Sequence, residues 1–231
     1  MDARSRNFND IPPQSQMMTD HIEQYREYRS IGKDLNSKLL KSLNDDELVE
    51  SAEFLDMTDE EDGEEVIYHD GELDMTVQSD FAIHEIERDG STGLEQFYQE
   101  ERWENEIERE LVEALRKSYT SLFEIEAARS DERVLVLRDL LDEGDSQIEL
   151  TDIKLSQTAH AGAMIFFRPV RLPEMTVTSG LILPFEAPYK DHLLEVNQQV
   201  MERTDSRPKA HKKFYIFYKM YQKYGSLGFM M

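Results

Sequence analysis

The feature that most restricts the fold is a change of hydrophobic period near residue 123. Before it, apolar residues recur at helical spacing, and after it they alternate with polar residues in five short runs. The segments between the runs (SDE, DEGDS, TAHAG and LPE) are turn-like, and turns that short join antiparallel neighbours. The sequence therefore predicts a five-stranded antiparallel meander, curled into a small barrel or a wrapped sheet. The runs are Phe123–Ala127, Val134–Leu140, Ile148–Leu155, Met164–Val170 and Thr176–Ile182.

Three details of these runs lead to further expectations. The alternation changes parity within the third run, which predicts a bulge or a bend near Thr151. Pro169 lies inside the fourth run, and because proline donates no ladder hydrogen bond, its end of the run should lie at a sheet edge. One residue in each run stands on the apolar parity of its strand and should be buried. These residues are Ile125, Val136, Ile148, Ile165 and Val177.

The N-terminal part, residues 17–88, is expected to be helical and acidic. It follows a polar, proline-containing tail at residues 1–16 that should be disordered. Apolar residues recur at helical spacing in three stretches, and Gly32 is expected to separate the first stretch from the second. Asn44 or Asp45 is placed to cap the third stretch. The stretches run over Met18–Tyr25, Leu35–Leu43 and Leu48–Leu55.

The end of this N-terminal part is strongly acidic, with ten Asp or Glu side chains between residues 56 and 74. We expect a solvated loop there around a short strand, Val66–Tyr68. A second short strand is expected over Leu73–Ile86, bent near Ser79. The run that begins at Thr58 resembles a calcium-binding loop, but its twelfth position is a histidine where such a loop needs a bidentate glutamate.

Residues 89–231 should form an α+β domain in which helices flank the predicted sheet. Thr92 followed by Glu95 has the spacing of a helix-capping box, and a long acidic helix is expected over residues 93–119, either continuous or broken near Arg102 and Trp103. Two helices should follow the sheet. The first begins near Pro188, and the second is basic and aromatic and ends near Gly225.

The composition restricts the class of protein. The chain has no cysteine, which excludes disulfides, thiolate metal sites and a cysteine nucleophile. No stretch approaches the roughly 20 apolar residues that span a bilayer, and the chain does not begin with a secretory signal, so we expect a cytoplasmic protein without membrane contact. The net charge of −23 repels phosphate backbones, so binding to nucleic acid is not expected. The acidity fits solubility or adaptation to high salt, or mimicry of a nucleic acid.

Part of the chain resembles a family that is uncharacterised and prokaryotic. The resemblance covers residues 89–185, in which short motifs follow an acidic helix. The motifs are Ser121–Ile125, Leu137–Leu141, Gly162 leading into Phe167–Val170, and Ser179–Gly180. In the family these look like the ends of successive strands, so the resemblance supports the β-meander. It implies no particular activity, and the cysteine-rich zinc motif of some members cannot transfer to a chain without cysteine.

Few residues are placed for catalysis. The chain has no phosphate-binding glycine loop, no Gly-x-Ser-x-Gly elbow and no His-Glu-x-x-His motif. His69 and His84 each stand beside an acid, and with Asp74 and Asp80 they could form a hydrolytic metal site if the strands around them paired. No catalytic residue, metal ligand or cofactor is assigned on this basis. A metal-dependent hydrolase that uses His69 and His84 is an alternative function.

The C-terminal helix is the most unusual element. Residues 207–231 hold six Lys or Arg and no acid, so the rest of the chain is even more negative than −23. We expect its aromatic side to pack on the core and its lysines to meet the acidic body, with docking on a partner as an alternative. The expected function is a non-catalytic protein-interaction or regulatory module of unassigned oligomeric state, and an acidic nucleic-acid mimic is a further alternative. Its candidate interaction surface comprises Lys212, Lys213, Tyr215, Lys219 and Lys223.

Overall fold

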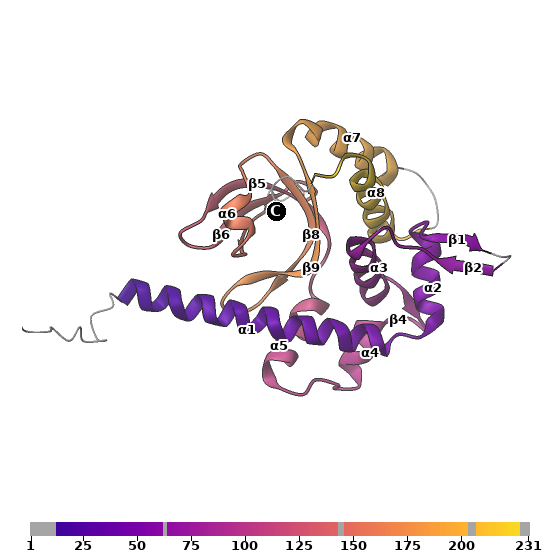
Figure 1. Cartoon of the computed structure of the whole chain (residues 1–231), viewed down its shortest axis with the longest axis horizontal. Helices are drawn as coiled ribbons and strands as arrows, with labels where there is room; N and C mark the ends of the chain where they lie inside the picture. The colour runs from indigo at the N-terminus through magenta and orange to yellow at the C-terminus, as the bar shows by residue number, and fades with distance from the viewer. Residues whose placement is uncertain (1–12, 62–63, 143–145, 203–206, 227–231) are drawn as a thin grey trace, which may run out of the picture.

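A single antiparallel sheet of five strands organises the fold. The computed structural model describes residues 13–61, 64–142, 146–202 and 207–226, and Figure 1 shows the sheet with one group of helices beside it and another below it. The strand order is β7-β6-β5-β8-β9. The sheet is open, so the predicted small barrel is wrong, although the sheet curls enough to bring β7 near β9. The strands are β5 (Ser121–Arg129), β6 (Val134–Asp139), β7 (Gln147–Thr151), β8 (Met164–Arg171) and β9 (Thr176–Phe185).

The predicted antiparallel pairing is confirmed, but the five strands do not form one simple meander. β5, β6 and β7 follow one another, whereas β8 pairs with the other edge of β5. The short helix α6 (Leu155–Thr158) carries the chain back across the sheet. The turn after α6 then binds β5 directly, because Ile125 donates to the Ala163 carbonyl and accepts from the Gly162 amide, both at 2.8 Å.

The detailed strand predictions have different outcomes. Of the two alternatives predicted near Thr151, the bulge is absent from β7 and the chain bends instead, because the strand ends at that residue and turns into α6. Bulges instead interrupt β5 between Ile125 and Ala127 and β8 between Phe167 and Pro169. The edge position of Pro169 is confirmed, since β5 begins opposite Phe167 and only β9 lies beside the proline. The five residues predicted to be buried are all in the core.

The N-terminal helices differ from the prediction in number. One continuous helix, α1 (Pro13–Ser42), replaces the first two expected helices and passes through Gly32. A glycine inside a helix costs only about 0.5–1 kcal/mol, which the burial of apolar residues such as Leu35 and Leu39 exceeds. The expected tail also ends earlier, because residues 13–16 belong to α1 and residues 1–12 lie outside the described residues.

The third expected helix is confirmed as α2 (Asp45–Phe54). The Asn44 side chain accepts from the Glu47 amide at 2.9 Å, and the Glu47 side chain accepts from the Asn44 amide at 2.8 Å. These two bonds complete the capping box, so Asn44 rather than Asp45 is the cap.

The acidic region contains one hairpin and one helix. The strand expected near Val66 is confirmed as β2 (Glu64–Ile67), which pairs with β1 (Thr58–Glu61). The second expected strand is wrong, because its residues form helix α3 (Glu72–His84). Val77 and Phe81 are four residues apart and both fully buried, which places them on one helical face.

The long acidic helix is broken at the predicted point into α4 (Gly93–Gln99) and α5 (Glu106–Arg116). A two-residue hairpin, β3 (Glu87–Arg88) with β4 (Ser91–Thr92), precedes α4. The predicted cap is present, since the Thr92 hydroxyl accepts from the Glu95 amide at 3.3 Å. After the sheet, a 3-10 turn at Ala187–Tyr189 leads into α7 (Lys190–Met201), and α8 (Lys209–Tyr224) follows.

Helices cover the sheet on one face and at one end. The face that carries Leu122, Phe166 and Leu183 packs against α2, α3 and α8. The opposite face is enclosed by the curl of the sheet itself, with Leu155 of α6 against it. Helix α1 runs along β9 and packs with α4 and α5 (Figure 1). The helices within the described ranges include none that combines the length and the apolar character needed to cross a membrane.

Candidate functional site

The predicted interaction surface on α8 is largely taken up by contacts within the chain. Lys212 is buried at 7% exposure, Lys213 and Tyr215 are half-buried, and Lys223 is exposed. The Lys219 ammonium lies 3.2 Å from a carboxylate oxygen of Asp56. The Tyr215 hydroxyl donates to the same oxygen at 2.6 Å. Contact of these residues with a partner protein stays a prediction.

The aromatic side of α8 packs on the core, as the sequence predicts. Phe214, Phe217 and Tyr218 are at most 1% exposed, and the ring of Phe217 stacks on Phe166 with centroids 4.6 Å apart. Asp56 ties the polar side of the helix to the acidic body, and the hydrogen bond from Tyr215 lowers the Asp56 pKa. Burial and this bond raise the pKa of Tyr215 to about 12. The basic helix is therefore part of the folded body.

The two histidines of the hydrolase alternative do not meet. The strand pairing that would join them does not form, because residues 72–84 are helical. His69 hydrogen-bonds the Gln78 side chain at 2.6 Å, while His84 lies at the other end of α3 beside Arg168. Burial, followed by the positive charge of Arg168, lowers the pKa of His84 to about 3. Within the described ranges, His, Asp and Glu side chains form no group of three or more that could hold a metal ion.

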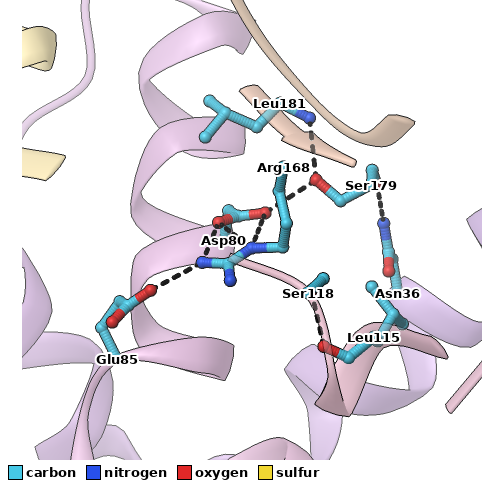
Figure 2. A network of polar contacts seen from close by, with 8 residues as sticks. All are labelled: Asn36, Asp80, Glu85, Leu115, Ser118, Arg168, Ser179 and Leu181. Carbon is cyan, nitrogen blue, oxygen red and sulfur yellow. Dashed lines mark hydrogen bonds and ion pairs between the residues drawn. The ribbon is translucent and has the colours of Figure 1, made fainter. Parts of the chain in front are cut away.

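A buried ion cluster instead joins α3 to the sheet (Figure 2). Arg168 of β8 donates from Nε and Nη2 to Asp80 Oδ2, at 3.0 Å each, and from Nη2 to Glu85 Oε1 at 2.7 Å. The Ser179 hydroxyl of β9 donates to the other Asp80 oxygen at 2.9 Å. The Arg168 and Asp80 side chains are 3% and 7% exposed. The cluster fixes the position of α3 relative to β8 and β9.

The charges in this cluster satisfy one another. Burial alone would raise the Asp80 pKa, but the Arg168 guanidinium and the hydrogen bonds from Arg168 and Ser179 hold it below its ordinary value. Burial opposes the charge of Arg168 as well, and the two carboxylates outweigh it and raise the Arg168 pKa. A buried pair of this kind costs desolvation energy and is stable only when its hydrogen bonds are made.

Helix α1 is fastened to the outer edge of β9 by two side chains. The Asn36 amide donates to the Ser179 carbonyl at 2.8 Å, as Figure 2 shows. About two turns earlier in α1, the Arg29 guanidinium donates to the Thr178 carbonyl and hydroxyl, both at 3.1 Å. The ion cluster and these bonds share Ser179, so α1, α3 and β9 are connected around one residue.

Three cavities follow α1 along this junction, and we call them together the α1 groove. The first, of about 510 Å³, lies between Tyr25 and Lys33 on one side and the start of α6 on the other. The second, of about 270 Å³, shares Arg29 and Lys33 with the first. The third, of about 460 Å³, shares Asn36 and Ser179 with the second and extends to Leu40 and α3. Neighbouring cavities share lining residues, so the three adjoin in a row along the helix, separated by the side chains of Arg29 and Asn36 that bridge to β9.

The two ends of the α1 groove differ in charge. The first cavity is lined by four Arg or Lys side chains and a single acid, Asp152. The third is lined by Glu72 and Asp80, with His84 and Met75 near them. Met75 is 47% exposed, which leaves an apolar surface at the acidic end. The groove can therefore distinguish the direction of a polar ligand that lies along it.

Sequence reasoning did not find this groove, because its walls come from segments more than 100 residues apart. One local signal was present: Arg26, Arg29 and Lys33 are spaced by three and four residues, which places them on one face of a helix. The expected interruption at Gly32 separates Lys33 from Arg26 and Arg29, so the sequence prediction does not place the three on one helix face. Lys154 and Ser179 join them only through the fold.

The fold and this groove define a class: an α+β protein with an open antiparallel sheet and a surface groove between its edge strand and a long helix. The chain belongs to the family of unknown function DUF7986, whose model matches residues 19–231. The match extends beyond residues 89–185, where the sequence resembled an uncharacterised family, and includes all of the groove. Comparison with curated proteins and with solved structures found no match.

Proposed function

We propose that this protein is a non-catalytic interaction module that binds a segment of another protein in the α1 groove. The observation that carries the proposal is the row of three adjoining cavities that forms the groove. It follows α1 from Tyr25 to Leu40, and at ~1.5 Å per helical residue this span is about 22 Å. An extended segment of about seven residues has the same length.

The walls of the groove support binding because they are fixed before a ligand arrives. The ion cluster around Arg168 holds α3, and Asn36 and Arg29 hold α1 against β9. A preformed site loses less conformational entropy on binding than one that must be ordered. The α1 groove is therefore bounded by elements that are bonded to one another.

The chemistry of the groove supports binding rather than catalysis. The Asp80 carboxylate accepts from Arg168 and Ser179, so it is already engaged by groups of the fold. His84 has a pKa of about 3, which makes it a weak base at neutral pH. Asp80 therefore stabilises the fold, and His84 is poorly suited to accept a proton from a substrate.

We also propose that the module acts in the cytoplasm. Support comes from the absence of cysteine in all 231 residues, which is compatible with a reducing compartment. A partner in the same compartment would meet the α1 groove without any covalent link.

Site-directed photo-crosslinking tests the proposal, since a chain without cysteine can be labelled at one chosen position. Ser30→Cys places a benzophenone maleimide at the first cavity, on an exposed residue of α1. Ser130→Cys places the same label on an exposed turn between β5 and β6 and is the matched control. Irradiation in native lysate should join a discrete protein to the first variant only. Equal crosslinking from both positions, or none from either, would refute the proposed function.

A further inference from the structure

The basic end of the α1 groove points to the chemistry of its ligand. Four cationic side chains line the first cavity: Arg26, Arg29, Lys33 and Lys154. Arg29 is engaged by Thr178, whereas the other three are exposed. Among the described residues, Arg26, Lys33 and Lys154 have no ion-pair partner. Other cations, such as Lys38 and Arg129, lie within 3 Å of a carboxylate oxygen, whereas the charges of these three side chains remain available to a ligand.

The single acid in the cavity does not neutralise these cations. One Asp152 oxygen accepts from the Tyr25 hydroxyl at 3.2 Å. The other accepts from the amides of Lys154 and Leu155, at 3.0 and 2.9 Å, and so supports the turn into α6. The single negative charge of Asp152 offsets at most one of the four cations, so the cavity keeps a net positive charge for a ligand.

The floor of the cavity is apolar. Tyr25, Leu155 and Ile182 contribute surfaces that are at most 9% exposed, and Ile153 is half-buried beside them. A ligand that fits this surface carries negative charge towards the rim and an apolar group towards the floor. A bare phosphate backbone has the charge but lacks the apolar contact.

We propose, on the basis of the proposed function above, that the partner presents an acidic segment with interspersed apolar residues, and that its carboxylates bind Arg26, Lys33 and Lys154. Charge complementarity carries this choice of occupant. The net charge of −23 does not prevent it, because at physiological salt charges more than about 8 Å away are largely screened. An acidic segment also relieves the repulsion between cations placed on one face of α1.

Selection from a display library of random octapeptides tests both proposals separately. The immobilised full-length protein should enrich peptides in Asp and Glu together with Leu, Ile or aromatic residues. Enrichment of peptides without acidic residues would overturn this inference and leave the proposed function standing. Failure to enrich any peptide sequence would overturn both. Stronger binding of a single-stranded oligonucleotide than of any selected peptide would also overturn the inference.

Charge-reversal variants then locate the contact. The double variant Lys33→Glu with Lys154→Glu should weaken binding of the best selected peptide about tenfold or more, measured by fluorescence anisotropy. Lys41→Glu, an exposed position on the same helix outside the groove, is the control and should change the affinity less than twofold. Circular dichroism confirms that each variant is folded. Equal losses in the two proteins, or dissociation of a self-associated form by the double variant, would overturn the inference.

Discussion

Replacing Arg168 by methionine should destabilise the protein by about 3–5 kcal/mol, the usual cost of removing one partner from a buried ion pair. The side chains of Asp80 and Glu85 are 7% and 11% exposed, so water replaces little of the lost guanidinium. Methionine retains most of the apolar stem, so the loss reports the uncompensated charges rather than a cavity. Such a loss is a large part of a typical stability of ~5–15 kcal/mol.

Urea unfolding at pH 7, followed by circular dichroism, measures this loss. The matched control is Arg116→Met, because the Arg116 guanidinium bonds Glu95 at 2.7 Å while both side chains are about one-third exposed. Exposed pairs contribute ~0–1 kcal/mol, so the control should stay close to the native protein. If Arg168→Met costs no more than Arg116→Met, the reasoning about the buried cluster is refuted.

The pH dependence gives a second readout of the same substitution. In the native protein Arg168 holds the Asp80 pKa below its ordinary value, so this stabilisation is present at neutral pH and is lost as pH falls below about 4. In the variant, burial without the guanidinium should raise the pKa above the unfolded value. Folding then takes up a proton, and stability rises as pH falls. The difference between the two proteins should therefore narrow from pH 7 towards about pH 4.

Three further predictions concern separate elements. Gly32→Ala should stabilise α1 by about 0.5–1 kcal/mol in the same unfolding assay, because a Cβ at this position meets nothing within 4 Å, and a loss would contradict that space. Phe217→Ala should cost about 3–5 kcal/mol, since the ring is 1% exposed against Phe166, and an unchanged melting temperature would show that α8 does not complete the core. The His84 imidazole, with a pKa of about 3, should show no NMR titration between pH 8 and 5, whereas a midpoint near 6.5 would contradict its burial.

The strands were predictable because short apolar runs are separated by turn-like segments, although β6 and β8 are buried on both parities rather than on one. Ile125 and Ile165 could be assigned to the core from this pattern alone. The strand order was not predictable, because it depends on the turn at Gly162, whose backbone amide bonds the carbonyl of Ile125, a residue far earlier in the sequence. A local pattern carries no information on which edge of β5 receives the next strand.

The error at α3 has a definite cause. Met75 and Val77, and then Phe81 and Ile83, are each two residues apart, which imitates a strand. Val77 and Phe81 are also four apart, and in the structure that helical relation buries both. A short apolar set can satisfy both periods, and tertiary packing then decides between them. Because α3 supplies one wall of the α1 groove, the incorrect prediction of a strand there also prevented prediction of the groove.

The contacts that hold α1 on the sheet also cover part of its edge strand β9. β9 is a ten-residue strand at the rim of the sheet, and an uncovered strand of this length is a template for intermolecular pairing and aggregation. Arg29 and Asn36 occupy the carbonyls of Thr178 and Ser179 near one end. Near the other end, the Ser226 amide donates to the Pro184 carbonyl at 3.1 Å. The contacts of α1 and of Ser226, which follows α8, therefore cover parts of this edge, and a covered edge is less open to pairing with another chain.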